Sequence, residues 1–386
     1  MITGIVCEYN PFHNGHLYQI EKAKAMGADK IVCVMSGNFV QRGECAFFDK
    51  HLRAKAAIMC GADVVIDLPT PWAMASAETF ARGSVGLLKN FGIEALSFGC
   101  ETDDEALLRG CADKLKDEEI SVLIKKYTAE GMSYPQSVSR VLTETLGEKA
   151  GELISSPNNT LAVEYIRQLP DNIRLLPVRR QGADHDSDTA KEGIASASMI
   201  RNLGLGEDSF AYVPEKLLPL YIDADRYSLS FSERAILSSL RMMKKEDYSL
   251  YVSDSKGLDM RIYDAIQKAT TLENLYASAK SKNYTHSRIR REVMNLYLKI
   301  KTDYSEGEPP YMRILAVSER GLSMLSKAKE NSSVPIITKF AETKNLAESS
   351  REIYEAECRN TDLFSLCTEK IRECALEKTN SLIIVK

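Results

Sequence analysis

The sequence contains no apolar run long enough to span a bilayer, and Met1 is not followed by the basic and then apolar segments of a signal peptide. Its nine cysteines are scattered and include no Cys-x-x-Cys pair. Cys358, Cys367 and Cys374 have no histidine nearby, so a zinc site is not expected. These absences predict a cytoplasmic protein without membrane contact and with reduced thiols.

The length and the charge distribution favour two domains. The chain has 386 residues, of which 44% are hydrophobic, which suits a globular protein with a sizeable core. Residues 226–386 carry 27 Lys and Arg against 22 Asp and Glu, whereas residues 1–225 carry 23 against 32. A basic second half is compatible with a polyanionic partner, although a charge-rich helical surface gives the same count.

The first half alternates strand-like and helix-like segments. Apolar runs predict strands at 4–7, 30–35, 64–68, 95–99 and 174–178, with helices between them at 17–26, 50–60 and 76–90. Short strands separated by helices imply βαβ units, so we expect an α/β fold with a parallel sheet. Active sites in such sheets lie at the carboxyl ends of the strands.

The second half has a different texture, because strand-like runs end near Leu218 and helical periodicity dominates. Helices are predicted at 233–244, 258–269, 272–279 and 287–300. The segments 310–315 and 334–337 are expected to be short pieces packed on these helices. We therefore predict a catalytic domain at 1–225 and a mainly helical domain at 226–386.

Two of the five histidines, His13 and His16, flank Gly15 where the first strand gives way to a helix. The first turn of a helix offers unpaired N–H groups and the positive end of the helix dipole, which attract phosphate. Gly15 lets a ligand approach the backbone, and the two rings can donate to phosphate oxygens. The alternative is that both histidines only cap the helix or fill the core.

A second phosphate grip is predicted at the segment 194–201, which reads IASASMIR. A serine there can cap a helix, and Arg201 follows Ser198 within the first turn. An ordinary N-cap with a surface arginine is the alternative.

Distinctive residues also follow other strands, with SGNFVQRG at 36–43, DLP at 67–69 and SFGCE at 97–101.

The segment 280–291 packs five basic residues around Tyr284 and His286. Basic side chains neutralise phosphates, and aromatic rings can stack on splayed bases. This pattern predicts an RNA-binding segment, and a solvated helix start is the alternative.

These motifs together resemble a known family. The HxGH stretch and the later Ser-x-x-Arg resemble the nucleotidyltransferase superfamily, the relatives of class I aminoacyl-tRNA synthetases. EYNPFHNGH, MSGNFVQRGE, FGCE, SPNN and IASASMIR occur in the order expected for the tRNA(Met) cytidine acetate ligase family, and YTHSRIRR and PYMRIL are similar to its C-terminal half. The resemblance implies a Rossmann-like nucleotidyltransferase domain with a parallel sheet, followed by a mainly α-helical C-terminal domain that binds tRNA.

The resemblance also implies a carbon–nitrogen ligase that adenylates acetate with ATP. The acetyl group would then pass to N4 of the wobble cytidine of elongator tRNA(Met). Mg²⁺ would be carried by ATP, since the sequence shows no carboxylate cage for it. The alternatives are a nucleotidyltransferase that adenylylates a small phosphorylated metabolite and a nucleotide-sensing RNA-binding protein without turnover. Oligomeric state stays open.

The site residues follow from the motifs and the resemblance. His13 and His16 are the expected catalytic residues. ATP contacts are expected at Ile5, Val6, Cys7, Glu8, Tyr9, Asn10, Pro11, Phe12, His13, Asn14, Gly15, His16, Leu17, Tyr18, Gly99, Asn158, Asn159, Arg179, Ser198 and Arg201. The choices between Asn158 and Asn159, and between Arg179 and Arg180, stay open, and Cys100 receives no chemical role. tRNA contacts are expected at Lys282, Arg288, Arg290 and Arg291.

Overall fold

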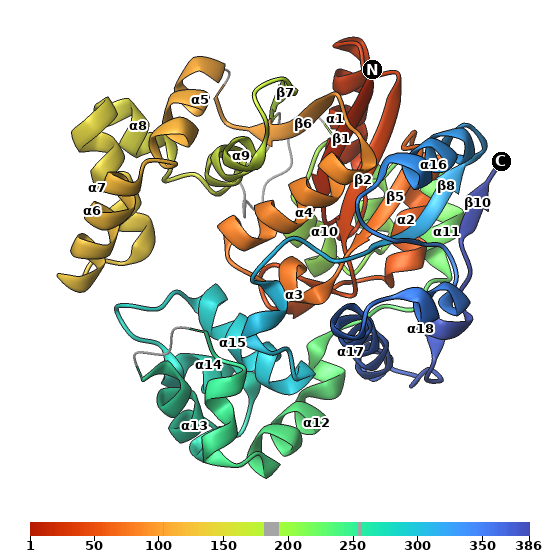
Figure 1. Cartoon of the computed structure of the whole chain (residues 1–386). Helices are drawn as coiled ribbons and strands as arrows, with labels where there is room; N and C mark the ends of the chain where they lie inside the picture. The colour runs from red at the N-terminus through yellow and green to blue at the C-terminus, as the bar shows by residue number, and fades with distance from the viewer. Residues whose placement is uncertain (103, 181–192, 254–256) are drawn as a thin grey trace.

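A twisted, mostly parallel sheet forms the centre of the molecule (Figure 1). The computed structural model describes residues 1–102, 104–180, 193–253 and 257–386. The five strands expected from the sequence are confirmed, and they lie parallel in the order β5-β2-β1-β6-β7. Their bounds are β1 Ile2–Cys7, β2 Lys30–Ser36, β5 Val64–Leu68, β6 Ala95–Cys100 and β7 Arg174–Arg179.

Three further strands come from the second half of the chain, so the expectation that strands end near Leu218 is wrong. β8 (Met312–Ser318) pairs antiparallel with β5, and it carries β9 (Ile336–Ile337) and β10 (Ile383–Val385) as parallel neighbours. β8 is buried along six of its seven residues, because helices cover the sheet there too. The sheet is therefore not confined to residues 1–225, and a functional boundary near 225 stays a prediction.

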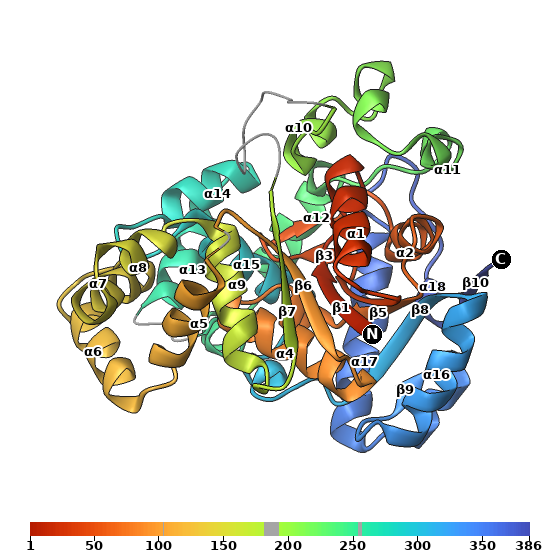
Figure 2. The ribbon, with the colours of Figure 1, turned by 90° about the horizontal axis from the view of Figure 1, so that it is seen from above.

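The two faces of the sheet are covered by different helices, and strand periodicity divides the core between them. In β2, Val32 and Val34 belong to one core, while Cys33 and Met35 belong to the other. The second core packs against α1 (Asn14–Ala25) and α2 (Lys50–Met59). Figure 2 shows these two helices on one side of the sheet. The other side carries α4 (Ala77–Phe91) and α16 (Glu319–Asn331), and α17 (Glu348–Phe364) contributes buried residues to the same core.

Two helical groups flank this central part (Figure 1). The first comprises α5 (Glu105–Lys114), α6 (Glu118–Ala129), α7 (Tyr134–Leu146), α8 (Glu148–Leu153) and α9 (Pro157–Gln168). The second comprises α12 (Leu229–Met242), α13 (Leu258–Lys268), α14 (Leu272–Ala279) and α15 (His286–Leu298), close to the predicted helices. The remaining helices are α3 (Thr70–Ala73), α10 (Ala197–Asn202), α11 (Leu218–Ile222), α18 (Leu376–Thr379), and the 3₁₀ turns Glu207–Tyr212, Glu215–Leu217, Lys245–Leu250, Thr302–Ser305 and Phe340–Asn345.

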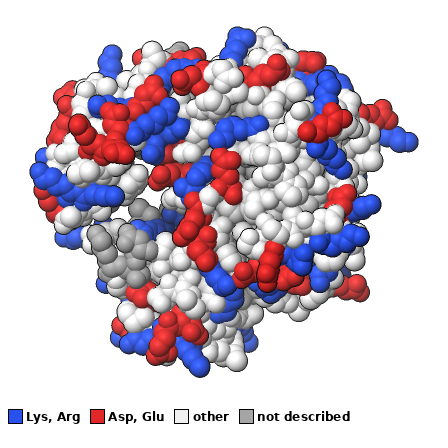
Figure 3. Space-filling view, in the orientation of Figure 1, with Lys and Arg blue, Asp and Glu red and all other residues white. Residues whose placement is uncertain are grey.

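The strand order fixes where a ligand can bind. From β1 the chain passes outward to β2 and β5, and it then crosses back to place β6 and β7 on the other side of β1. Ligands of such sheets bind at this switch point, outside the carboxyl ends of the strands. Acidic and basic side chains are interspersed over the face seen in Figure 3. None of the helices in the described ranges combines the length and apolarity needed to cross a membrane.

Candidate active site

A cavity of about 280 Å³ lies at the carboxyl ends of β1, β6 and β7, at the switch point. The start of α1 and the start of α10 line its opposite wall, and an antiparallel hairpin of β3 (Phe39–Val40) and β4 (Glu44–Cys45) lies beside it. The lining residues are Val6, Cys7, Glu8, Tyr9, Asn10, His13, Gly15, His16, Tyr18, Gln19, Val40, Gln41, Arg42, Glu44, Phe80, Phe98, Gly99, Asn158, Leu161, Tyr165, Val178, Arg180, Ile194, Ala195, Ser196, Ala197, Ser198 and Arg201.

The two histidines form the N-terminal cap of α1 and also face the cavity. Nδ1 of His13 accepts the Gly15 N–H at 3.0 Å, and Nδ1 of His16 accepts the His13 N–H at 3.2 Å, which is a capping box. The rings stack with their centroids 3.7 Å apart. A Cβ on residue 15 would lie 2.9 Å from the His13 ring, so only glycine fits this stack. The capping interpretation and the ligand interpretation of the sequence are therefore both compatible with the structure.

Both histidines are neutral at physiological pH. Burial lowers the pKa of His13 to about 3, and the nearby charges of Arg180 and Arg201 lower it further. Burial likewise lowers the pKa of His16 well below its ordinary value, with His13 and Arg180 as the next causes. Because each Nδ1 accepts a backbone N–H, each Nε2 carries the remaining hydrogen. The pair is thus a set of uncharged donors, suited to phosphate oxygens without a proton transfer.

Two arginines supply positive charge beside this pair. Arg201 is held by its own surroundings, with Nη1 donating to the Asn10 carbonyl at 2.7 Å and Nη2 donating to Ser198 Oγ at 3.3 Å. The Ser196 hydroxyl caps α10 by accepting the Met199 N–H at 3.1 Å. Arg180 follows β7 and also lines the cavity. Two guanidinium groups and two imidazole donors at one cavity form a site of the kind that binds a polyphosphate.

Glu101, which follows β6, forms hydrogen bonds with the start of α9. Its carboxylate accepts from the Ser156 hydroxyl and from the Asn158 amide, while its own N–H donates to Asn159 Oδ1 at 2.9 Å. Asn158 lines the cavity, whereas Asn159 is buried and does not reach it. The geometry therefore favours Asn158 over its neighbour as a ligand contact.

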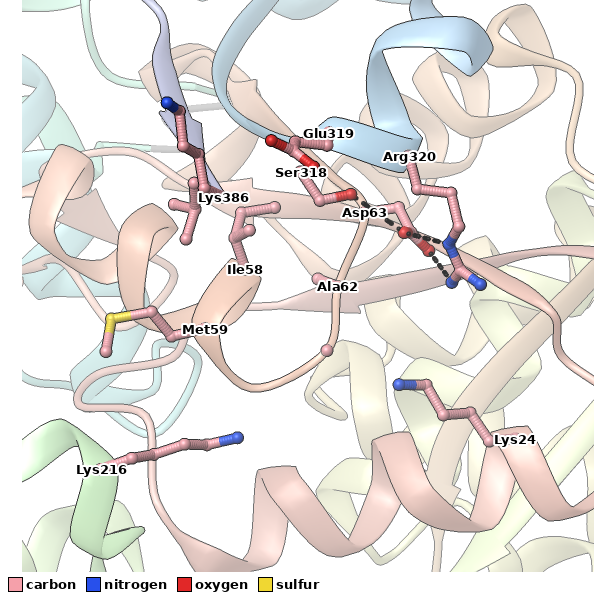
Figure 4. A pocket seen from close by; sticks show the side chains of 12 residues that line it. Lys24, Ile58, Met59, Ala62, Asp63, Lys216, Ser318, Glu319, Arg320 and Lys386 are labelled. Atoms are coloured by element: carbon pink, nitrogen blue, oxygen red, sulfur yellow. Dashed lines mark hydrogen bonds and ion pairs between the residues drawn. The ribbon is translucent and has the colours of Figure 1, made fainter.

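A larger cavity, of about 470 Å³, lies elsewhere (Figure 4). Asp63 precedes β5 and Ser318 ends the antiparallel β8, so this hollow is at the amino ends of the parallel strands. Figure 4 shows Arg320 bonded to Asp63, with 3.0 Å between Nη2 and Oδ2. Because nucleotide crevices form at the opposite ends, size alone does not make this hollow the active site. Throughout the described ranges, no three His, Cys, Asp or Glu side chains gather in a way that would hold a metal ion.

Comparisons with known proteins show which family the chain belongs to. A family model described as HIGH Nucleotidyl Transferase matches residues 1–379. The chain is 34% identical over 398 residues to a protein of Clostridium botulinum named tRNA(Met) cytidine acetate ligase, covering 96% of this chain and 95% of that protein. A protein of the same name from Syntrophomonas wolfei is 36% identical, covering 95% and 94%. The chain belongs to the tRNA(Met) cytidine acetate ligase family.

Solved structures extend the comparison to three dimensions. Thermotoga maritima TmcAL in its apo form I has a TM-score of 0.92 and 27% identity, with 100% of both chains covered. The same protein bound with alpha-thio ATP has a TM-score of 0.90 and 26% identity, with 99% of both chains covered. The expected fold class is therefore confirmed for this member of the cytidine acetate ligase family.

Not every residue expected from the family motif faces the cavity. Ile5 and Phe12 are fully buried in the core, and Asn14 instead donates to the Gly193 and Ala211 carbonyls at 3.1 and 2.9 Å. The residues of the motif that line the cavity are Val6, Cys7, Glu8, Tyr9, Asn10, His13, Gly15, His16 and Tyr18, whereas Pro11 and Leu17 do not. Gly99 lines the cavity too, and Arg180 does so rather than Arg179.

The predicted tRNA contacts of this family member lie on and before α15, and two of them also hold the hairpin. Arg290 binds Glu44 at 2.5 Å, and Arg291 Nη1 donates to the Gln41 carbonyl at 3.4 Å. Arg288 donates to the Ser253 carbonyl at 3.0 Å. Lys282 is exposed.

The hairpin turn therefore packs tightly against α15. Gly43 has a φ of +74°, and a Cβ there would lie 2.6 Å from the Arg291 backbone nitrogen, so only glycine is accommodated. The cavity wall and the basic segment are thus in direct contact.

Arg53 is a supporting residue that sequence reasoning missed. Although it is fully buried in α2, its guanidinium donates to the Glu8 carbonyl at 2.6 Å, the Ser36 carbonyl at 3.0 Å and the Phe48 carbonyl at 2.9 Å. It also donates to the Gly37 carbonyl. Arg53 thereby ties the segments that follow β1 and β2 to one another. The only feature of the sequence that could have indicated this role is an arginine in an otherwise alanine-rich helix.

Proposed function

We propose that this chain is a tRNA(Met) cytidine acetate ligase, which activates acetate with ATP and acetylates N4 of the wobble cytidine of elongator tRNA(Met). One observation carries the proposal: the neutral, stacked pair of His13 and His16 lies beside Arg180 and Arg201 at the switch point of a chain of this family. A cytoplasmic location belongs to the same proposal, in keeping with nine free cysteines.

In the first half-reaction an acetate oxygen attacks the α-phosphate of ATP in line, and pyrophosphate leaves. Charge develops on phosphate oxygens, so catalysis consists mainly of positioning and electrostatic stabilisation. The Nε2–H groups of His13 and His16 donate to these oxygens, and the positive end of the α1 dipole favours their negative charge. Arg201 and Ser198 hold the leaving pyrophosphate, whose charge Mg²⁺ carried by ATP would share.

The remaining ATP contacts are proposed along the residues of the first motif that line the cavity, together with Gly99, Asn158 and Arg180. Glu8 is the exception, because its carboxylate would repel the triphosphate. Asn159 and Arg179 are secondary choices, because neither lines the cavity. Asn159 instead supports the Glu101 backbone.

In the second half-reaction the cytidine N4 attacks the acetyl carbonyl, and AMP leaves. Adenylation is needed because free acetate is a poor acyl donor and the N4 lone pair is delocalised into the ring. The wobble base lies in a single-stranded loop, so it can be splayed into a pocket at low cost. We assign tRNA binding to the half that contains Lys282, Arg288, Arg290 and Arg291, which would contact phosphates.

The test supplies ATP, isotopically labelled acetate and bulk tRNA, and then follows the label. Nuclease digestion should release labelled N4-acetylcytidine, and the label should be absent when ATP is omitted. A chain that adenylylates a small phosphorylated metabolite would release pyrophosphate only with that metabolite and would leave the tRNA unlabelled. A nucleotide sensor would show no acetate-dependent exchange of pyrophosphate into ATP at all.

A further inference from the structure

Glu8 is an acidic residue that lines the same cavity as His13, His16, Arg180 and Arg201. It follows β1 directly, and its backbone carbonyl is fixed by Arg53 at 2.6 Å. Its Oε1 accepts the Gln41 N–H of the hairpin at 2.9 Å. Within the described part of the chain, Oε2 has no hydrogen-bond or ion-pair partner. A carboxylate oxygen is thus held in place at the cavity by two contacts that leave it available to a ligand.

Glu8 contacts other segments of the chain than Arg201 does. The charges that act on His13 are those of Arg180, which follows β7, and of Arg201, which belongs to α10. Glu8 instead contacts the hairpin, whose carbonyl at Gln41 is bound by Arg291 of α15. A carboxylate repels a triphosphate, so this wall suits the other substrate of the transfer step. RNA held by the basic segment before and on α15 would approach the cavity from this wall.

The transfer step requires a group that accepts a proton. When N4 attacks the acetyl carbonyl, the new C–N bond leaves nitrogen with a proton that must depart as AMP leaves. His13 and His16 do not suit this role, because each Nδ1 is already occupied and each Nε2 carries a hydrogen. Burial raises the pKa of Tyr9 and of Cys7, so both hold their own protons.

Two carboxylates remain among the described lining residues, Glu8 and Glu44. Glu44 is already paired with Arg290 at 2.5 Å. Carboxylate oxygens are also the natural acceptors for the N4 amino group of cytosine.

We propose that Glu8 is the catalytic base of acetyl transfer, with Oε2 accepting the N4–H of the cytidine. The lone pair of N4 attacks the acetyl carbon, the bond from that carbon to the phosphate oxygen breaks, and AMP departs with that oxygen. One N4 proton passes to Glu8 and then to water. This assignment rests on the proposed function, and it separates Glu8 from the adenylation chemistry of the same cavity.

The experiment compares wild type, Glu8→Gln and Glu44→Gln in three assays. Acetate-dependent exchange of pyrophosphate into ATP and trapping with hydroxylamine report acetyl-adenylate, because hydroxylamine attacks it without help from the enzyme. Single-turnover transfer to saturating tRNA reports the second step. Glutamine has the shape of glutamate and keeps an oxygen for the Gln41 N–H. We expect Glu8→Gln to retain exchange, trapping and tRNA binding but to lose about 10²–10⁴-fold in transfer.

Three outcomes would overturn the assignment. Transfer by Glu8→Gln at the wild-type rate would show that no base is needed there. An equal loss of exchange and transfer would place Glu8 in ATP binding or adenylation. A selective loss of transfer in Glu44→Gln, with none in Glu8→Gln, would move the role to Glu44.

A further variant covers the case in which Glu8→Gln does not fold. Glu8→Asp keeps the carboxylate and should retain part of the transfer activity. If Glu8→Asp is folded and fully active in exchange but has no transfer activity, the assignment of Glu8 as the proton acceptor is contradicted. If wild type itself labels no tRNA, the proposed function fails together with this assignment, and that result is distinct from a failure in the variants alone.

Discussion

Arg290 of α15 binds Glu44 of the hairpin with 2.5 Å between Nη1 and Oε1, so one ion pair joins the cavity wall to the helical group. The same guanidinium reaches Glu273 of α14 at 3.2 Å. It also lies over the Tyr276 ring, 5.2 Å from the centroid. Glu44 lines the cavity and Glu273 does not, which makes the two carboxylates a matched pair for mutation.

Removing Arg290 should therefore affect adenylation as well as tRNA binding. Arg290→Ala frees the hairpin, and we expect the KM for ATP in the exchange assay to rise up to about fivefold, the equivalent of the ~1 kcal/mol that such a partly exposed pair contributes at most. Glu44→Gln should raise it similarly, whereas Glu273→Gln, whose side chain is 75% exposed, is the control and should not. An unchanged KM in Arg290→Ala would mean that the hairpin is held without this ion pair.

Paired variants separate the capping role of His16 from its role toward ATP. His16→Ala removes both the Nδ1 acceptor and the Nε2 donor, and His16→Gln keeps an acceptor at the third helical position, as in common capping boxes. Both should lose about 10²–10³-fold in exchange, because a preorganised donor is missing. Only His16→Ala should also lose about 0.5–2 kcal/mol of unfolding free energy. Near-normal exchange in either folded variant would contradict the catalytic assignment.

The buried histidines should make the protein sensitive to acid. The pKa of His13 is lowered to about 3 in the folded chain, whereas an unfolded chain protonates histidine near its ordinary value of 6.5. Between these values the unfolded state binds more protons than the folded state, so the free energy of unfolding should fall as pH drops from about 6.5 toward 3. Above pH 6.5, His13 should add nothing to the pH dependence of stability.

The slope attributable to His13 is at most about 1.4 kcal/mol per pH unit. His13→Asn keeps a good N-cap and should flatten the curve. Urea unfolding of both proteins between pH 4 and 8 measures the difference, and parallel curves would disprove the contribution of His13.

Arg201 should contribute to ATP binding and not to tRNA binding. Arg201→Ala removes the guanidinium that lies beside Ser198 and the Asn10 carbonyl. Arg201→Lys keeps the charge but not the two-pronged geometry, so it should recover only part of the lost affinity. Nucleotide titration and tRNA binding are measured on the same preparations. An equal loss of ATP and tRNA affinity in a folded variant would identify Arg201 as an RNA contact.

A double variant tests the division of labour between the two halves. Lys282→Ala with Arg288→Ala should weaken tRNA binding and reduce its salt dependence, since fewer counterions are released. Exchange of pyrophosphate into ATP should persist, because neither residue lines the cavity. Arg290 and Arg291 are left intact, because they hold the hairpin. If exchange falls as far as transfer, or if transfer is unaffected, the proposed division is wrong.

The local elements of the site followed from the sequence. Strand β1, the proline-marked break and the start of α1 each depend on neighbouring residues, so apolar runs, Pro11 and the His-x-Gly-His spacing sufficed to place His13 and His16. Ser198 and Arg201 followed from the spacing of one helical turn in the same way. The choice between Arg179 and Arg180 did not follow, because successive residues at a strand end point to different sides, and only pairing with β6 decides which side faces the cavity.

The sequence by itself determined the five parallel strands of the first half, the place of His13 and His16 at the start of α1 and the family of the chain, because these depend on short-range periodicity and on contiguous motifs. Only the tertiary structure decided that β8 completes the sheet beside β5, that Arg53 supports four carbonyls around the site, and that Arg290 reaches Glu44. β8 and β5, like Arg290 and Glu44, are separated by more than two hundred residues along the chain. Such contacts arise from the packing of distant segments, which hydrophobic patterns and charge counts do not encode as pairs.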